Sequence, residues 1–190
     1  MHKQILRLHR APSRVIVLVN LVHRKCTVID NKLSFHKNCD VIFKKCRQRM
    51  HVLYTLRAFR VNGRIIEKCY HAFVLSVLSF SMVCWFGSLS EKERKRLNGI
   101  VRVCGKIVGN NQQTLEHLYR VKSADKAAKI KSDPAHVLSL LFQVLPSGRR
   151  LRHPKCRTKR FQNTFIPQAI AFLNQRWLHG SVCWGHAARA

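Results

Sequence analysis

The apolar residues of this chain recur at spacings of three and four over several long segments, a period typical of amphipathic α-helices. The first predicted helix covers residues 39–60, with Asn38 as its expected N-cap and the Asn62-Gly63 pair as its end. One face of this helix carries Ile42, Cys46, Met50, Leu53 and Leu56. A second helix is predicted over residues 64–85 and is expected to end at Gly87.

A capping box predicts where the third helix begins, because Ser90 is followed three residues later by Glu93. The apolar face of that helix comprises Leu97, Ile100, Val101, Cys104, Ile107 and Val108. Gly109 is expected to end it, and Thr114 is the expected cap of a fourth helix, which stops at Asp133-Pro134. After a short apolar helix or strand over residues 135–145, a last helix is predicted over residues 166–173, with Pro167 in its first turn.

The two ends of the chain lack this helical period. Residues 15–19 form a continuous apolar run and residues 27–35 alternate loosely, so both are candidates for short strands. Residues 175–190 are predicted to be an unstructured tail. The sequence therefore predicts a mainly α protein, a small helical bundle of about four to five helices with one or two short N-terminal strands and a basic, irregular C-terminal segment.

One predicted helix is also a candidate membrane segment. Residues 69–90 contain no Lys, Arg, Asp or Glu, and this stretch is long enough to cross a bilayer. His71 and three serines interrupt it, and its strongly apolar centre is short. A buried core helix is therefore the favoured interpretation, and a small basic protein anchored in a membrane by residues 69–90 is an alternative.

Charge separates this chain from an ordinary globular domain. Its 190 residues and apolar fraction of 46% suit one domain with a real core. However, 36 Lys and Arg residues face only 8 Asp and Glu residues, and no acid occurs before Asp30 or after Asp133. Such an excess favours a polyanionic partner. Nucleic acid is preferred over an anionic membrane because the basic residues are spread along the chain and interleaved with aromatic ones.

Cysteine usage and the N-terminal residues favour an intracellular protein, in the nucleus or cytoplasm. The eight cysteines include no Cys-x-x-Cys pair, and several lie in apolar helical patterns, where a thiol packs as a small hydrophobe. The first ten residues are basic and lack the pattern of a secretory signal peptide.

The densest positive charge lies between a Pro-Ser-Gly turn at residues 146–148 and the last predicted helix. Seven of the twelve residues from Arg149 to Arg160 are basic and none is acidic. The predicted phosphate-binding residues are Arg149, Arg150, Arg152, Lys155, Arg157, Lys159 and Arg160. Phe161 is the predicted base-stacking residue, and Phe165 and Trp177 are further candidates, although core packing is favoured for Phe165. We call residues 149–160 the basic strip.

No pattern in the chain indicates catalysis, a cofactor or a small-molecule substrate. There is no Gly-rich phosphate loop and no nucleophile in a recognisable turn with a His partner. Three pairs have zinc-like spacing, namely His36/Cys39, His153/Cys156 and Cys183/His186, and 26 residues separate the last two pairs. The surrounding cations disfavour a dication there, so no metal is predicted.

Eight segments occur in an order that is more specific than any one of them. They are Asn31-Lys-Leu-Ser-Phe35, Lys44-Lys-Cys-Arg-Gln-Arg-Met50, Leu53-Tyr-Thr-Leu-Arg-Ala-Phe59, Ser79-Phe-Ser-Met-Val-Cys-Trp-Phe-Gly87, Arg96-Leu-Asn-Gly-Ile-Val-Arg-Val-Cys-Gly-Lys-Ile-Val-Gly109, Asp133-Pro-Ala-His-Val-Leu138, Leu145-Pro-Ser-Gly-Arg-Arg150 and Arg160-Phe-Gln-Asn-Thr-Phe-Ile-Pro167. This series resembles the thumb and post-thumb region of reverse transcriptases encoded by non-LTR (LINE-type) retrotransposons. The resemblance covers residues 27–174 and leaves residues 1–26 unmatched.

The resemblance implies a part of a polymerase that grips the template–primer backbone. It also implies which part is missing, because the polymerase motif of that family contains an Asp-Asp pair that holds two metal ions. This chain contains no Asp-Asp pair, and Asp30 and Asp40 are ten residues apart. We therefore expect a catalytically inactive retrotransposon-derived remnant that binds RNA or DNA without sequence preference.

A second resemblance covers residues 39–86. The amphipathic segment around residues 44–59 is similar to the N-terminal domain of AlkB homologue 8, an alkylated-DNA-repair dioxygenase joined to a tRNA methyltransferase, which implies an accessory domain as an alternative. The dioxygenase needs a His-x-Asp…His iron site, but no His here is followed by Asp two residues later. A methyltransferase needs a Gly-rich turn, and no Gly-x-Gly occurs.

Overall fold

The structure is a computed structural model that describes residues 27–29 and 34–178 of the chain. Its helices, with 3₁₀ and π segments marked η, are α2 (His36–Ala58), α3 (Gly63–Cys69), η1 (Tyr70–Leu75), α4 (Ser76–Ser79), α5 (Met82–Trp85), η2 (Phe86–Ser88), α6 (Glu91–Val108), α7 (Leu115–Ser132), η3 (Val137–Leu141), α8 (Lys159–Gln162) and α9 (Phe165–Leu178). The prediction of a mainly α protein is confirmed.

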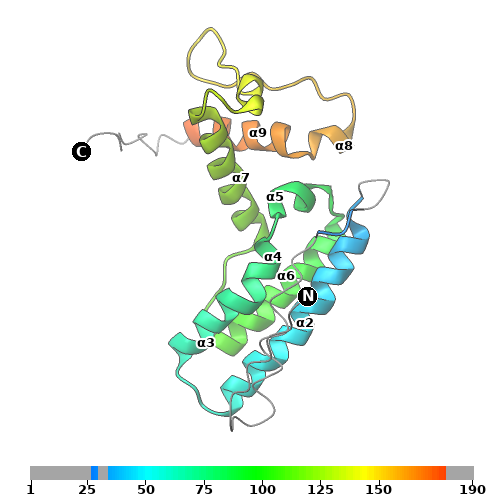
Figure 1. The fold of residues 1–190 in the computed structure, drawn as a ribbon, viewed down its shortest axis with the longest axis vertical. Coiled ribbons are helices and arrows are strands. Elements are labelled where there is room, and N and C mark those ends of the chain that lie inside the picture. Colours follow the sequence, from blue (N-terminus) through cyan, green and yellow to red (C-terminus); the bar gives the residue numbers. More distant parts are fainter. Residues whose placement is uncertain (1–26, 30–33, 179–190) are drawn as a thin grey trace, which may run out of the picture.

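The helices form an elongated molecule with two parts (Figure 1). In the lower part, α2, α6 and the series from α3 to α4 lie side by side. Helix α7 extends from this bundle into the upper part, where it packs against α9 and η3. The connection between residues 142 and 158 forms the outer loop of the upper part.

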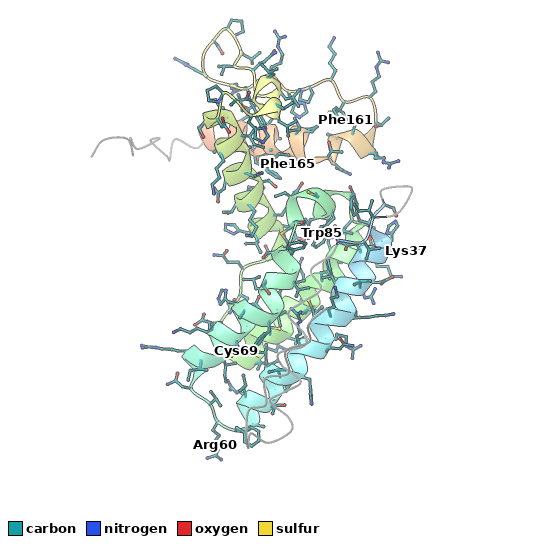
Figure 2. The ribbon with its side chains drawn as sticks, viewed as in Figure 1. Lys37, Arg60, Cys69, Trp85, Phe161 and Phe165 are labelled. Atoms are coloured by element: carbon teal, nitrogen blue, oxygen red, sulfur yellow. The ribbon has the colours of Figure 1, made fainter. Side chains whose placement is uncertain are left out.

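Each part has its own buried core. In the bundle, buried side chains of α2 such as Cys46 and Leu53 pack with Leu97 and Cys104 of α6. Trp85, which is fully buried, lies where the two parts meet (Figure 2). The upper core joins α7 and α9 through the small or branched residues Ala124, Ala127, Ile130, Ala169, Ile170 and Leu173, with Phe142 and Leu151 from the connection. Alanines at this contact let the two helices approach closely.

The first helix begins earlier than predicted, because Asn38 is not its N-cap. Helix α2 starts at His36, after Phe35 in the left-handed conformation. Asn38 is 1% exposed, and its Oδ1 accepts a hydrogen bond from the backbone N–H of Val28 at 3.0 Å. The side chain therefore holds the preceding chain segment instead of capping its own helix.

The second predicted helix is interrupted twice. A π-helical turn, η1, follows α3, and the Phe73 carbonyl within it accepts a hydrogen bond from Nη1 of the buried Arg49 at 2.7 Å. The chain then breaks at Phe80 and Ser81, where Ser81 is left-handed, and the Trp85 indole donates to the Phe80 carbonyl at 2.9 Å. A side-chain hydrogen bond to a backbone carbonyl thus accompanies each interruption.

By length and composition alone, residues Gly63–Ser88 qualify as one candidate membrane span among the described residues. Many of the apolar side chains of this segment lie in the bundle core, including Val74, Leu78 and Met82. A soluble core helix gives the same signal.

The predictions for the two ends of the chain need correction. Residues 27–29 and 34–35 form no strand, and the Val28 N–H is paired with a side chain instead of a neighbouring strand. The candidate strand at residues 15–19 and most of the predicted tail lie outside the described residues. The tail was predicted to begin at residue 175, but α9 continues to Leu178. Gln175, Arg176 and Leu178 are good helix formers, and the next glycine is Gly180.

The capping box predicted at the start of α6 is confirmed, and its Glu93 also contacts α2. Ser90 and Glu93 exchange hydrogen bonds, with the Ser90 N–H 2.8 Å from Glu93 Oε2. The other oxygen of Glu93 lies 2.6 Å from Nδ1 of His36, at the start of α2. Burial alone would raise the pKa of the Glu93 carboxyl, but the hydrogen bonds from His36 and Ser90 outweigh it and hold the pKa below its ordinary value.

We therefore expect Glu93 to make folding sensitive to acid. A carboxylate whose pKa is lowered in the folded state contributes stability above its unfolded pKa of about 4.5, and that stability is lost as pH falls through the lower folded value. Glu93→Gln keeps a residue type compatible with a capping box but cannot titrate. Urea unfolding at a series of pH values should show a steeper loss below pH 4.5 for the original chain than for this variant. Identical acid profiles would contradict this role.

Candidate nucleic-acid interface

The basic strip begins in a short hairpin that is held by backbone hydrogen bonds. The Leu145 N–H donates to the Arg150 carbonyl and the Arg152 N–H to the Gln143 carbonyl, both at 2.8 Å. Val144 and Leu151 form an antiparallel bridge across the turn, in which Gly148 adopts a positive φ of 69°. The Pro-Ser-Gly turn predicted from the sequence thus fixes where the strip starts.

Asn174 of α9 clamps the strip to the upper core. Its Oδ1 accepts from the Leu151 N–H at 2.9 Å and its Nδ2 donates to the Leu151 carbonyl at 3.0 Å. The amide group therefore satisfies both backbone groups of one residue, as a neighbouring strand would. The Leu151 side chain is 3% exposed and packs in the same core, so the chain is anchored between Arg150 and Arg152.

Removal of this clamp is expected to loosen the strip while α7 and α9 stay packed. Asn174→Leu keeps a similar volume but leaves the Leu151 N–H and carbonyl without their partner, which should cost about 2 kcal/mol of unfolding free energy. Amide exchange at residues 150–152 should accelerate more than exchange in α6. As a control, Gln175→Leu changes the adjacent, exposed residue of α9. Unchanged exchange at Leu151 in the Asn174 variant would contradict the clamp.

The far end of the strip is fixed by α8. The Thr158 side chain caps this helix by accepting from the Phe161 N–H at 3.2 Å. The Gln168 amide of α9 donates to the Gln162 carbonyl, at the end of α8, at 2.9 Å. The strip is therefore tethered to the fold at both ends, with its middle, residues 152–156, in no regular secondary structure.

All eight predicted nucleic-acid-binding residues are exposed. They are Arg149, Arg150, Arg152, Lys155, Arg157, Lys159, Arg160 and Phe161. Long side chains project outward from this loop in Figure 2. The salt bridges of the described region involve other residues, so none neutralises Arg149, Arg150, Arg152, Lys155, Arg157 or Lys159. A row of unpaired cations on a tethered segment is suited to contact with successive phosphates.

The candidate stacking residues differ in exposure. Phe161 on α8 is 43% exposed, and Phe165, at the start of α9, is half-buried against the upper core (Figure 2). The side chain of Trp177 lies outside the described part of the structure. Phe161 is therefore the aromatic residue that the fold leaves available beside the strip.

The cysteine and histidine pairs do not assemble a ligand set in the described region. His153 Nδ1 lies 2.9 Å and Cys156 Sγ 3.4 Å from the Pro154 carbonyl oxygen, and Cys183 and His186 lie outside the described residues. Among the residues placed in the structure, no group of three His, Cys, Asp or Glu side chains is arranged to hold a metal ion.

Three cysteines pack as apolar residues. Burial raises the pKa of Cys39 to about 11 and that of Cys46 and Cys104 to about 12, so these thiols stay protonated in the bundle core.

Sequence reasoning missed Asn174 and a second group of cations. No local signal marked Asn174, which directly follows the helix predicted over residues 166–173. Helix α7 exposes further cations, namely Arg120, Lys122, Lys126, Lys129 and Lys131.

No protein-family model matches this chain, and no curated protein or solved structure is significantly similar to it.

Proposed function

We propose that this chain is a helical nucleic-acid-binding module that holds the phosphate backbone of RNA or DNA along the basic strip. The observation that supports this most directly is a strip tethered at both ends, by the hairpin with Asn174 and by α8, in which the six cations from Arg149 to Lys159 take part in none of the salt bridges of the described residues. Tethering lowers the entropy that the strip must lose on binding, which distinguishes it from a mobile basic loop.

The resemblance to the thumb region of LINE-type reverse transcriptases agrees with this role. In those enzymes the region grips the template–primer backbone. Since the chain lacks an Asp-Asp pair, we propose that it binds nucleic acid without copying it. Recognition through phosphates implies weak dependence on base sequence.

A filter-binding titration with single-stranded oligonucleotides tests this function. Several unrelated sequences, as RNA and as DNA, should bind with affinities within about tenfold of one another, because phosphate contacts carry no sequence information. Heparin, a polyanion without bases, should compete. Absence of binding, or a strong preference for one sequence, would contradict the proposal.

Membrane association is a second candidate, favoured by the candidate span Gly63–Ser88. Carbonate extraction separates the two functions. A protein that binds nucleic acid through surface charge is released at high pH, whereas an inserted helix stays in the membrane pellet. Retention in the pellet would favour the second candidate.

A further inference from the structure

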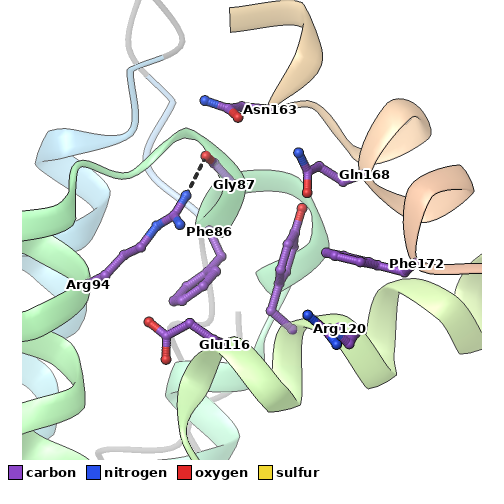
Figure 3. A pocket seen from close by; sticks show the side chains of 9 residues that line it. Phe86, Gly87, Arg94, Glu116, Arg120, Asn163, Gln168 and Phe172 are labelled. Carbon is purple, nitrogen blue, oxygen red and sulfur yellow. Dashed lines mark hydrogen bonds between the residues drawn. The ribbon is translucent and has the colours of Figure 1, made fainter. Parts of the chain in front are cut away.

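A cavity of about 230 Å³ lies where the two parts of the fold meet, apart from the basic strip (Figure 3). Arg94 of α6 lines one side and Glu116 and Arg120 of α7 line another. Asn163 and Gln168, which flank the start of α9, cover it from the upper part. The space is larger than one water needs and suits a small polar group.

Two hydrogen-bond donors in this cavity have no partner within the protein. The Tyr119 side chain is 5% exposed and lines the cavity, and its hydroxyl makes no hydrogen bond. The Arg94 guanidinium donates through Nη2 to the Gly87 carbonyl at 2.9 Å, but its buried Nε–H is unpaired. Buried polar groups are nearly always paired, so two such donors in one cavity indicate a missing acceptor.

The Tyr119 hydroxyl is a donor at neutral pH. Burial raises the pKa of Tyr119, and the nearby Ser123 and Arg94 oppose only part of that rise. The Ser123 hydroxyl is itself buried and unpaired, and no hydrogen bond of good geometry joins the two groups. A buried phenol of this kind donates to an acceptor.

The charges of the lining favour an anion. Arg94 and Arg120 are cationic, and each lies over an aromatic ring, Phe86 at 5.4 Å and Phe172 at 5.5 Å. Glu116 is the acidic residue of the lining, and both of its oxygens already accept from the Asn98 amide, at 2.8 and 2.9 Å. The amide nitrogen of Gln168 donates to the Gln162 carbonyl, and the buried lining atoms without a hydrogen bond are the Tyr119 hydroxyl and the Arg94 Nε–H, which are both donors.

One lining residue of the cavity closely follows the basic strip along the chain. Asn163, in its lining, directly follows α8, which carries Lys159, Arg160 and Phe161. A nucleic-acid backbone that follows the strip to α8 arrives beside this cavity.

We propose that the cavity binds a phosphate group, and that its natural source is the terminal phosphate of the nucleic acid on the basic strip. The choice of source rests on the proposed function, whereas the phosphate chemistry rests on Arg94, Tyr119 and Arg120 alone. A phosphate supplies the acceptors that the Tyr119 hydroxyl and the Arg94 Nε–H lack.

The central test uses Tyr119→Phe, which removes one donor and no packing atom from the ring. Without ligand, this variant should melt at the same temperature as the original chain or higher, because the hydroxyl is buried without a partner. Inorganic phosphate should raise the melting temperature of the original chain, and the variant should need about fivefold more phosphate for the same shift. A lower melting temperature for Tyr119→Phe, or equal phosphate responses, would overturn the site.

Oligonucleotides of one sequence with a 5′-phosphate, a 3′-phosphate or no terminal phosphate identify the source. One phosphorylated form should bind the original chain about fivefold more tightly than the unphosphorylated form, and Tyr119→Phe should abolish the difference. Arg94→Gln should abolish it too, and Arg102→Gln, on the exposed side of α6, is the matched charge control. If inorganic phosphate raises the melting temperature but the three oligonucleotides bind with equal affinity, the site binds a free phosphate compound. That result would overturn the terminal phosphate as the source. If no oligonucleotide binds, the proposed function fails, while the phosphate titration still decides the cavity.

Discussion

Replacement of six strip cations by glutamine is expected to weaken binding to a single-stranded oligonucleotide by about a thousandfold to ten-thousandfold in about 0.1 M salt. The six are Arg149, Arg150, Arg152, Lys155, Arg157 and Lys159, which are exposed and outside every salt bridge of the described residues. Each phosphate contact on a single strand contributes about 0.7 to the salt exponent, so six contacts amount to about four decades in affinity at that salt.

A matched variant separates the strip from the general positive charge of the chain. Six exposed cations of α6 and α7 serve as the control, namely Arg102, Lys106, Lys122, Lys126, Lys129 and Lys131. Their replacement changes the net charge equally, and we expect an affinity loss of less than about tenfold, from long-range attraction alone. Filter binding measures both losses. Equal losses would show that total charge, and not the tethered strip, governs binding.

Gly87→Ala is expected to lower the unfolding free energy by about 3 kcal/mol, a large effect for one methyl group. An added Cβ at Gly87 would lie 2.2 Å from the Asn163 carbonyl oxygen and 2.9 Å from the Tyr119 hydroxyl. A backbone carbonyl cannot rotate away, so the segment between α8 and α9 must shift. The contact between the bundle and the upper part should therefore open first.

Gly99→Ala is the control for this prediction. No atom lies within 4 Å of a Cβ added at Gly99, in the middle of α6. Alanine should stabilise that helix by about 0.5–1 kcal/mol, because glycine is a poor helix former. Urea unfolding of the two variants gives the comparison. A Gly87→Ala protein as stable as the original chain would mean that the two parts do not meet as the structure places them.

Local signals in the sequence predicted most of the helix ends. Ser90 with Glu93, Thr114 and Gly109 each form the cap expected of them, because capping depends on residues within one turn. Asn38 misled the prediction, since an asparagine before a helix suits both an N-cap and a buried hydrogen bond. The break at Ser81 was not predicted because no Gly or Pro marks it; the Trp85 indole, five residues after Phe80, donates to the Phe80 carbonyl there.

The candidate site was likewise predictable only in part. Charge density located the basic strip, since seven cations among twelve residues need no fold to be noticed. The clamp by Asn174 joins residues 23 positions apart, and the cavity joins α6 and α7 to residues beside α9. Neither has a local pattern, because both depend on how distant segments pack.

The salt dependence of binding tests the central claim most directly. Affinity for a single-stranded oligonucleotide, measured over a range of salt concentrations, should fall with a slope that is steeper by about 4 for the original chain than for the six-glutamine strip variant. The control variant of α6 and α7 should keep nearly the slope of the original chain. A slope that does not change when the strip is neutralised would contradict a phosphate grip at residues 149–160.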